Sequence, residues 1–290
     1  MIGTRLTELF GESGYSVAHL VRSIRSHGVK TYLWDIERNT IDRSALEGAD
    51  AMIHLAGTNV GGKRWTKKRK DEILQSRLQS TRLLFEELKK RNHQIKTFVS
   101  ASAVGYYGPG DNETYFTEED NQGKGFLADV VGKWESAVDE IATLGIRVVK
   151  LRGGVVLSER GGALKEMVLP VKLFVGSPLG TGQQMLSWIH IDDFCRIFIK
   201  ALEDETMHGV YNAVAPNPVS NKELTVMMAK ILHRPIVLPR VPEFAIKLLF
   251  GEMAEIVLEG SKASCKKILS TGFQFKFENA YEALVDLLKK

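Results

Sequence analysis

The sequence predicts an α/β fold in which helices cover a doubly wound parallel sheet and a smaller lobe follows at the C-terminal end. Two observations lead to this prediction. Short apolar runs, typical of buried strands, alternate with longer segments whose apolar residues recur at helical spacing. In addition, a glycine precedes the first helical segment, and one buried strand ends in Ala56 and Gly57. Such alternation indicates βαβ units and therefore a parallel sheet.

The helices are predicted from apolar spacing and from the residues that end them. Ile2, Leu6, Leu9 and Phe10 recur at helical spacing, and Gly11 supplies a stop. Further helices are predicted at residues 67–91, 126–144, 193–202, 244–249 and 281–288.

The strands are predicted from short apolar runs between turn residues, at residues 15–21, 31–34, 51–55, 97–100, 147–151 and 187–191. Gly145 is the residue best able to take the left-handed position after the helix that ends near residue 144. Because an apolar strand follows at once, the chain reversal there is encoded locally.

Composition shifts predict two parts. Residues 1–215 form the nucleotide-binding part, to which the glycine-rich stretch 161–184 adds a contribution to the substrate lobe. The run Pro216-Asn217-Pro218 marks the second shift, so residues 216–290 are predicted to form the smaller C-terminal substrate or accessory domain.

The composition favours small-molecule partners. The 290 residues include 39 basic and 35 acidic side chains, a mild balance that lacks the one-sided field of a nucleic-acid binder. Cys195 and Cys265 lie far apart, which suits reduced thiols in the cytoplasm and indicates no metal site. Because no apolar run approaches the roughly 18 residues of a membrane span, no membrane partner is expected. A homodimer is one possible assembly.

The first residues match the end of a glycine-rich dinucleotide loop. In a doubly wound fold, the first strand leads into this loop, and the next helix directs its N-terminal amides at the pyrophosphate. Gly3 fits the last glycine of such a loop, but the strand and the earlier glycines that should precede it are absent. We therefore expect the first, central strand to be missing, through a start codon assigned too late or a shortened chain.

Two further segments predict the cofactor. Arg22, Ser23 and Arg25 follow a strand where an NAD-binding protein would usually place a carboxylate, so these residues favour the 2′-phosphate of NADP. The alternative is that both arginines are solvated loop charges. Leu55, followed by Ala56 and Gly57, ends a buried strand and would let the backbone approach the cofactor, whereas His54 is expected to be a core histidine.

Several motifs resemble those of the extended short-chain dehydrogenases/reductases. More narrowly, they are similar to the branch called "epimerase family protein", which carries an extra C-terminal domain, and the similarity covers essentially the whole chain. The residues that carry it are Lys63-Arg64-Trp65-Thr66, Ser76-Arg77, Val99 to Gly108 with Gly105-Tyr106-Tyr107-Gly108, Trp188 to Asp193, and Gly272-Phe273.

The resemblance implies a Rossmann-like domain that binds NADP, with a catalytic serine, a tyrosine acid/base and a lysine four residues after the tyrosine. Ser102 matches the serine and Lys133 matches the lysine, but the tyrosine position holds Asp129. The ordinary pKa of an aspartate side chain, about 3.9, is far below the value of about 10 for a tyrosine, so the standard pair is broken. Tyr106 or Tyr107 could supply the hydroxyl instead. The alternatives are a loop-capping role for Ser102 and a surface ion pair between Asp129 and Lys133.

The same resemblance places a substrate site near the cofactor. Lys63, Arg64 and Trp65 are expected to line its mouth and to face an anionic group, with a solvated helix end as the alternative. Ser76, with Arg77 beside it, is expected to face the cofactor, with helix packing as the alternative.

Two strand ends complete the predicted site. Arg152 precedes two glycines that would let the chain pass close to the nicotinamide. His190 is expected to face the cleft between the two parts, and Asp192 is expected to cap the following helix.

Together with the residues, the resemblance implies an NADP-dependent oxidoreductase or epimerase acting on a small, sugar-nucleotide-like substrate. Ser102 would polarise the reacting oxygen, Lys133 would orient the ribose, and a tyrosine of the 106–107 pair would be the acid. The rival hypothesis is a sensor or scaffold protein that binds NADP without catalysis, and Asp129 is its main support.

Overall fold

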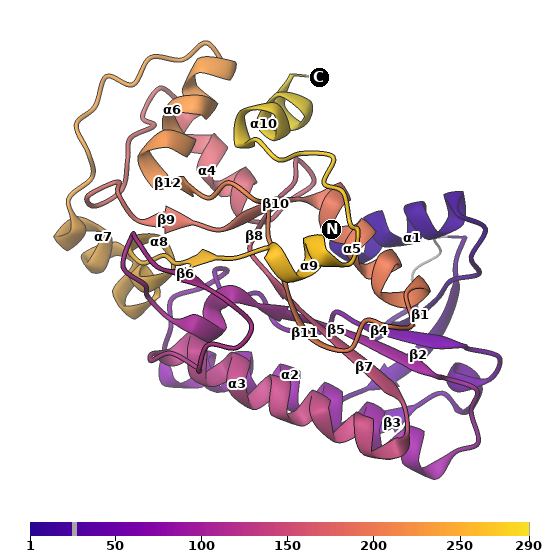
Figure 1. The fold of residues 1–290 in the computed structure, drawn as a ribbon. Helices are drawn as coiled ribbons and strands as arrows, with labels where there is room; N and C mark the ends of the chain where they lie inside the picture. The colour runs from indigo at the N-terminus through magenta and orange to yellow at the C-terminus, as the bar shows by residue number, and fades with distance from the viewer. Residues whose placement is uncertain (25–27, 290) are drawn as a thin grey trace.

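The computed structural model describes residues 1–24 and 28–289, and a parallel sheet lies at its centre (Figure 1). Its four strands are β4 (Ala51–His54), β5 (Thr97–Ala103), β7 (Arg147–Gly153) and β11 (Gly209–Ala213), in the order β11-β7-β5-β4. All neighbouring pairs in this sheet are parallel, as the alternation of strands and helices predicts.

A second, separate sheet holds β1 (Ala18–Val21), β2 (Lys30–Asp35) and β3 (Thr40–Ile41). β1 and β2 are parallel, while β2 and β3 are antiparallel. Among the described strands, β1 and β4 each have one edge without a hydrogen-bonded neighbour. The absence of a first, central strand stays a prediction.

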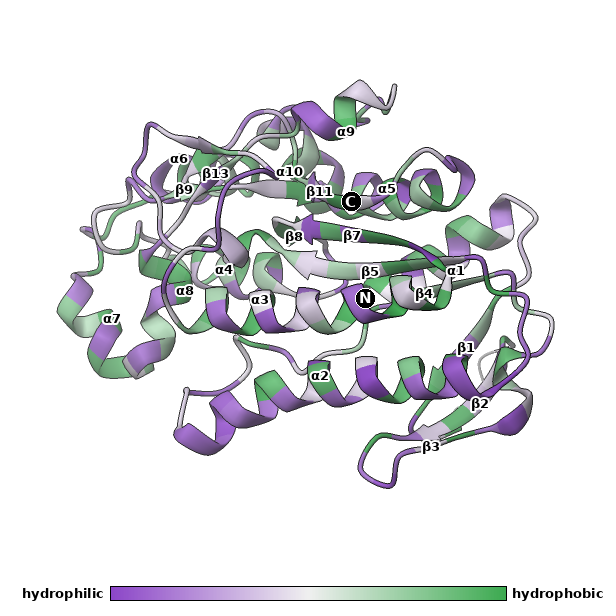
Figure 2. Ribbon diagram, turned by 60° about the horizontal axis from the view of Figure 1, so that its bottom comes forward, coloured by the Kyte–Doolittle hydropathy of each residue, from purple (hydrophilic) through white to green (hydrophobic). Residues whose placement is uncertain are grey.

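Helices cover both faces of the sheets (Figure 1). α1 (Ile2–Glu12) and α5 (Ile191–Glu203) lie on one face, and α2 (Lys67–Lys90) and α3 (Phe126–Asp139) lie on the other. α5 buries Phe194, Ile197 and Phe198 in one core, whereas Leu84 and Trp134 belong to the core beneath α2 and α3. The start of α2 is strongly hydrophilic (Figure 2), because residues 67–70 are all basic. The doubly wound arrangement of helices on both faces is confirmed.

Local signals account for the ends of the long helices. The Thr66 hydroxyl accepts a hydrogen bond from the Arg69 backbone N–H and caps α2. After α3, the chain continues through the short helix η3 (Glu140–Leu144) to Gly145, which has φ 78° and ψ 13°. The predicted left-handed glycine is therefore confirmed.

The cap of α5 differs from the predicted one. His190 precedes the helix, and its Nδ1 accepts a hydrogen bond from the Asp192 backbone N–H at 3.1 Å. The Asp192 carboxylate instead binds the guanidinium of Arg5 at 2.7 Å, which joins α5 to α1. This ion pair raises the pKa of Arg5. The prediction that Asp192 is the capping side chain is wrong, because a closer cation takes its carboxylate.

Most of the remaining elements follow β7 in the sequence. The helices are α4 (Ala163–Lys172), α6 (Asn221–Ile231), α7 (Glu243–Phe250), α8 (Glu255–Leu258), α9 (Lys266–Ser270) and α10 (Ala280–Leu288), with the short helices η1 (Arg43–Leu46), η2 (Val104–Tyr107) and η4 (Gly251–Ala254). The strands are β6 (Tyr115–Phe116), β8 (Val155–Leu157), β9 (Met185–Leu186), β10 (Trp188–His190), β12 (Val219–Ser220) and β13 (Lys262–Ala263). β8 pairs with β10, β9 with β12, and β6 with β13.

The C-terminal segment is anchored on α5 by one buried carboxylate. Asp193 is fully buried, and its two oxygens accept the backbone N–H groups of Lys276 and Phe277. Arg196 supplies the counter-charge at 2.8 Å. Side chains of the C-terminal segment, such as Leu284, share one apolar core with α5. The boundary at residues 215 and 216 stays a prediction. Within the described part of the chain, none of the helices has both the length and the apolarity needed to cross a membrane.

Candidate cofactor and active site

A cavity of about 800 Å³ lies where β1 and β4 end. The residues that line it come from β1 and the residues after it, from β2, from the loop after β4 and from α2. They include His19, Arg22, Ser23, Thr31, Trp34, Leu55, Ala56, Gly57, Thr58, Asn59, Arg69 and Ser76. Gly3 adjoins this wall, because a Cβ built on it would lie 3.6 Å from Leu55. The structure thus brings together Gly3, Arg22, Ser23, Leu55, Ala56, Gly57 and Ser76, while the predicted Arg25 lies outside the described residues.

Side chains of α2 hold the loop after β4. The Ser76 hydroxyl accepts the Thr58 backbone N–H and donates to the Ile73 carbonyl, both at 3.0 Å. Arg77 donates to the carbonyls of Thr58 and Ile73 at 3.2 and 2.9 Å. A Cβ on Gly57 would lie 3.0 Å from the guanidinium carbon of Arg77, so a larger residue here would push the guanidinium away by a few tenths of an ångström. The hydrogen bonds from Ser76 and Arg77 therefore fix the loop after β4, with Gly57 packed against the Arg77 guanidinium.

Arg77 is an uncompensated charge. Its guanidinium lies 5.2 Å from the centre of the Trp134 ring, and burial lowers its pKa to about 10. No carboxylate of the described residues forms an ion pair with it. Taking a charge out of water without a partner is unfavourable. An anion bound beside the Gly57 loop would compensate the positive charge of Arg77.

A polar row crosses the sheet at the carboxyl ends of three strands. Ser102, Arg152 and Asn212 are direct neighbours in register on β5, β7 and β11. Glu135 of α3 accepts hydrogen bonds from Ser102 Oγ at 2.5 Å and from Arg152 Nε and Nη2 at 2.8 Å each. Burial alone would lower the pKa of Arg152, but the hydrogen bonds and charge of Glu135 outweigh it and raise that pKa. The only hydroxyl proton of Ser102 is thus already donated, which leaves none to polarise a substrate oxygen.

A second ion pair lies two residues earlier on β7 and four residues later on α3. Lys150 of β7 donates to Asp139 of α3 at 2.7 Å. Two residues along a strand advance the chain by about 6.6 Å, and four residues along a helix advance it by about 6 Å. Because these advances match, Arg152 meets Glu135 and Lys150 meets Asp139. The inner pair is buried, whereas Asp139 is 58% exposed.

Tyr107 is a structural member of this network. Its side chain is 2% exposed, its hydroxyl donates to Asn212 Oδ1 at 2.7 Å, and it accepts from Arg152 Nη1 at 3.0 Å. Its ring stacks on Phe116 with centroids 5.0 Å apart. Burial raises the pKa of Tyr107 to about 12. With both roles of the hydroxyl occupied, Tyr107 cannot exchange a proton with a ligand.

Tyr106 differs from its neighbour. The guanidinium carbon of Arg152 lies 3.4 Å from the centre of the Tyr106 ring, a close cation–π contact. The ring is only partly buried, and its hydroxyl has no hydrogen-bond partner in the described parts of the chain. Tyr106 is therefore the hydroxyl of this pair that is free for chemistry.

The face of α3 that meets η2 is apolar. A Cβ on Gly105 would contact Leu127 at 3.5 Å and Val131 at 4.0 Å. Asp129 and Lys133 are exposed instead, and Asp129 accepts a hydrogen bond from Gln122 at 3.3 Å. Because each helical residue turns by about 100°, Lys133 points roughly 160° away from Val131 and Glu135. The structure does not bring Lys133 to Ser102 or to the cavity.

The basic loop before α2 packs against the second part of the molecule. Trp65 is 6% exposed, its ring contacts Phe126, and its Nε1 donates to the Val60 carbonyl at 2.9 Å. It therefore packs in a small core and offers no face to a ligand. Lys63 and Arg64 are exposed, and the Arg64 guanidinium adjoins Gly251.

His190 is also buried rather than open to a cleft. It is 1% exposed, its ring lies 4.0 Å from that of Phe277, and its Nε2 is 3.4 Å from Asp286. Burial lowers its pKa. Its capping role and its neighbours make it part of the contact between α5 and the C-terminal segment.

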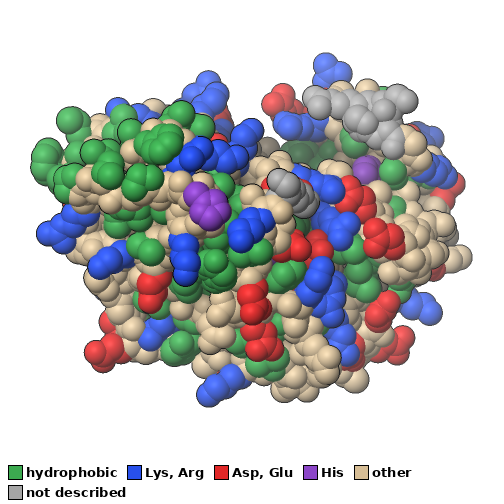
Figure 3. Space-filling view, turned by 90° about the horizontal axis from the view of Figure 1, so that it is seen from above, with side chains coloured by type: hydrophobic (Ala, Val, Ile, Leu, Met, Phe, Trp, Pro, Cys, Tyr) green, Lys and Arg blue, Asp and Glu red, His purple; other side chains and the backbone are tan. Residues whose placement is uncertain are grey.

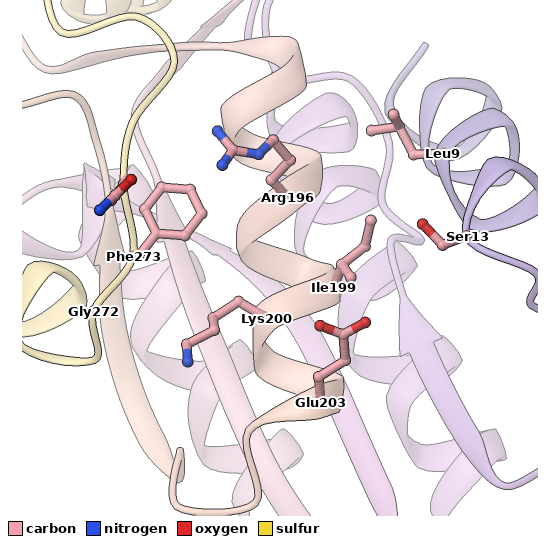
Figure 4. Close-up of a pocket in the computed structure, with 9 residues that line it drawn as sticks. Leu9, Ser13, Arg196, Ile199, Lys200, Glu203, Gly272 and Phe273 are labelled. Carbon is pink, nitrogen blue, oxygen red and sulfur yellow. The ribbon is translucent and has the colours of Figure 1, made fainter.

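A second cavity of about 560 Å³ lies between α1, α5 and residues 272–274 (Figure 4). Its two cations, Arg196 and Lys200, form ion pairs with Asp193 and Asp204, each at 2.8 Å. Because both cations already have carboxylate partners, this cavity has no unpaired positive charge that would attract an anion. It differs in this respect from the 800 Å³ cavity, which has Arg77 next to its wall.

His54 is buried beneath the same strands, as expected for a core histidine. Its Nε2 lies 3.0 Å from Ser80 Oγ. Burial, helped by the nearby charge of Arg77, lowers the pKa of His54 to about 4.

His54 should make stability depend on pH. Between about pH 6.5 and 4, His54 is protonated in the unfolded chain but stays neutral in the folded chain. The free energy of unfolding therefore decreases by about 3 kcal/mol as the pH is lowered through this window. Urea unfolding at several pH values should show this loss in the native chain and a clearly smaller loss in His54→Gln, in which His190 keeps a pKa lowered by burial. His208→Gln, at an exposed histidine, should keep the full loss. An unchanged pH profile in His54→Gln would refute this assignment.

The residues that sequence reasoning missed are Glu135 and Asn212. A signal for Glu135 was available. Lys150 and Arg152 alternate on one strand, and Glu135 and Asp139 are one turn apart on the preceding helix, with opposite charges. Asn212 had no such signal, because only the register of β11 places it beside Arg152.

With this geometry in place, comparisons with known proteins decide the family. The profile of the "NAD dependent epimerase/dehydratase family" matches residues 1–213, and the profile of a "domain of unknown function (DUF1731)" matches residues 241–287. The chain belongs to the NAD dependent epimerase/dehydratase family. The epimerase family protein YfhF of Bacillus subtilis is 36% identical over 289 residues, which is 99% of this chain and 94% of that protein. The epimerase family protein SAR0825 of Staphylococcus aureus is 35% identical, with 100% and 96% covered.

Several solved structures share the fold of this chain. The human epimerase family protein SDR39U1 (isoform 2), crystallised with NADPH, has a TM-score of 0.88 and 33% identity, with 100% of this chain and 96% of that chain covered. A nucleoside-diphosphate sugar epimerase from Corynebacterium glutamicum has a TM-score of 0.79 and 32% identity, with 99% and 56% covered. UDP-glucose 4-epimerase from Thermus thermophilus, in complex with NAD, is 18% identical with a TM-score of 0.76 and supports the fold alone.

Proposed function

We propose that this chain is an NADP-dependent oxidoreductase or epimerase of the extended short-chain dehydrogenase type, acting on a small, sugar-nucleotide-like substrate. The observation that carries the proposal is the 800 Å³ cavity lined by Gly57, with the Arg77 guanidinium, which has no carboxylate partner among the described residues, directly behind that glycine. Two relatives support it. One was crystallised with NADPH, and the other is described as a nucleoside-diphosphate sugar epimerase.

The residues present fit a dinucleotide. Arg77 and the backbone of Gly57 and Thr58 would hold an anionic group, since the guanidinium lies directly against Gly57 and donates to the Thr58 carbonyl. Arg22 and Ser23 line the same cavity and would hold the 2′-phosphate. The bound nucleotide would supply hydride transfer.

Within the protein, Tyr106 would exchange a proton with the substrate. Glu135 holds the Arg152 guanidinium by two hydrogen bonds, and Arg152 in turn supports the Tyr106 ring at 3.4 Å. A side chain fixed in this way loses little freedom when it reacts. The role is proposed for Tyr106 because Ser102 and Tyr107 have no free hydroxyl proton.

Titration with NADPH and with NADH, followed by nucleotide fluorescence, tests the cofactor. NADPH is expected to bind more tightly than NADH. A form of the chain extended upstream by the in-frame residues of its gene is titrated in parallel, because the predicted missing strand would border this cavity. If neither form binds either nucleotide, the proposed function is refuted.

The two tyrosines should respond differently to loss of the hydroxyl. Tyr106→Phe should keep the fold and lower turnover by roughly 100-fold or more, as expected for loss of a general acid. Tyr107→Phe should keep turnover but cost about 1 to 3 kcal/mol of stability, because Arg152 and Asn212 lose a partner. A panel of nucleotide sugars, assayed by NADPH absorbance and product chromatography, measures the first effect, and urea unfolding measures the second. Full activity of Tyr106→Phe would contradict the assignment.

One observation favours a second candidate, a protein that binds NADP without turnover. The α3 residues that face η2 are Leu127 and Val131, which cannot transfer protons. Tight NADPH binding combined with no turnover on the whole panel would favour this candidate.

A further inference from the structure

Exposed apolar side chains gather on one surface formed by two chain segments, residues 169–175 and 237–249. They come from the end of α4 and the residues after it, from the segment before α7, and from α7 itself. We call this surface the apolar patch, and its residues are Leu169, Leu173, Phe174, Val175, Val237, Leu238, Phe244, Leu248 and Leu249. Figure 3 shows apolar side chains crowded on the left of the face seen from above, with Lys and Arg at the edge.

The two chain segments of the apolar patch are joined by hydrogen bonds. Gly180 N–H donates to the Val241 carbonyl at 2.8 Å, and Val241 N–H donates to the Pro178 carbonyl at 2.9 Å. The Arg234 guanidinium lies 4.5 Å from the centre of the Phe174 ring, which links the segments a second time. The two segments that carry the patch therefore lie side by side.

α7 shows that this exposure is not a consequence of weak packing. Ile246, on its inner side, is 2% exposed, so the helix already has a buried apolar face. Phe244 and Leu248, one turn apart on the outer side, are 74% and 78% exposed. A helix on a water-exposed surface normally carries polar residues on that side. Large exposed apolar patches mark protein or membrane contacts.

The charges around the patch favour an anionic occupant. Residues 165–175 and 233–249 contain five Lys or Arg, two Glu and no Asp. Lys172, Arg240 and Lys247 are exposed among the apolar side chains. A second copy of the chain would bring the same cations face to face across a twofold axis, which is unfavourable. Protruding aromatic and aliphatic side chains with basic neighbours are the composition of helices that lie in a lipid interface.

We propose that the apolar patch binds the surface of membranes that contain anionic lipids. Phe244 and Leu248 enter the interface, while Lys172, Arg240 and Lys247 contact the headgroups. This inference departs from the expectation, drawn from composition, that the chain has no membrane partner. It is independent of the proposed function, because the patch shares no residue with the cofactor cavity.

Co-sedimentation with vesicles tests the proposal. The native chain should bind phosphatidylcholine vesicles that contain phosphatidylserine, bind pure phosphatidylcholine at least tenfold more weakly, and be released by high salt. The double variant Phe244→Ser/Leu248→Ser should bind the mixed vesicles at least tenfold more weakly. Lys172→Gln/Arg240→Gln should lose the preference for phosphatidylserine.

Matched controls lie outside the patch. Leu269→Ser changes an exposed apolar residue of α9, and Lys89→Gln/Lys90→Gln removes two exposed charges from the end of α2. Both should bind vesicles like the native chain, and all variants should keep the nucleotide affinity of the native chain. Equal binding by Phe244→Ser/Leu248→Ser, or no binding to mixed vesicles, would overturn the proposal. So would a dimer, seen by analytical ultracentrifugation, that the same double variant dissociates.

Discussion

Replacement of Glu135 by alanine is expected to lower the free energy of unfolding by about 3 to 5 kcal/mol. Glu135 and Arg152 are both almost fully buried, and two hydrogen bonds join them. Without the carboxylate, the guanidinium stays buried and unpaired, which costs more than the pair itself contributes. Ser102 loses its acceptor as well. Urea unfolding at neutral pH measures the change.

The chain supplies its own control for this experiment. Asp139 lies one turn further on α3 and pairs with Lys150, but the carboxylate is 58% exposed. Asp139→Ala should cost less than Glu135→Ala, because water reaches the carboxylate of this pair, although the Lys150 side chain is itself buried. The double variant Glu135→Leu/Arg152→Met should recover most of the lost stability, because it leaves no buried charge. Equal costs for Glu135→Ala and Asp139→Ala would refute the account of the buried pair.

Arg77→Met is expected to weaken NADPH binding by roughly 10- to 100-fold, the effect of losing a charged hydrogen-bond donor of about 1.5 to 3 kcal/mol. Its free energy of unfolding should change by less than about 1 kcal/mol, because the lost hydrogen bonds are offset by removal of an unpaired, partly buried charge. Nucleotide titration and urea unfolding measure the two quantities.

Arg82 is the control for this variant, since it lies on the same helix but is exposed. Arg82→Met should leave the NADPH affinity within about twofold of the native value, as expected for a screened charge. If Arg77→Met and Arg82→Met bind NADPH equally well, Arg77 does not hold the nucleotide.

Most of the fold could be predicted because its signals are local. The periodicity of α1, α2 and α3 and the glycine after residue 144 depend only on neighbours in the sequence. The cap of α5 could not be predicted in this way. Whether His190 or Asp192 fills it depends on Arg5, which lies 187 residues from Asp192.

The candidate site shows the same limit. The predicted residues at strand ends, such as Arg22 and Gly57, meet at one cavity, because parallel strands bring their carboxyl ends to one edge. The spacing of four residues from Asp129 leads to Lys133, but spacing alone does not give the rotation of the helix. The face of α3 that meets the sheet is set by contacts such as Glu135 with Ser102, across 33 residues.

The separation of the two sheets has a consequence for how the molecule resists unfolding. β1, β2 and β3, with η1 after them, are joined to the rest by side chains such as Trp34 and Leu46 packed beside α2, and within the described residues no backbone ladder runs from these strands to β4. This layer can therefore open as a cooperative unit of its own, at a smaller free energy than the four-stranded sheet. A ligand in the cavity between β1 and β4 would contact both units. Its binding energy would then couple their unfolding into one cooperative transition.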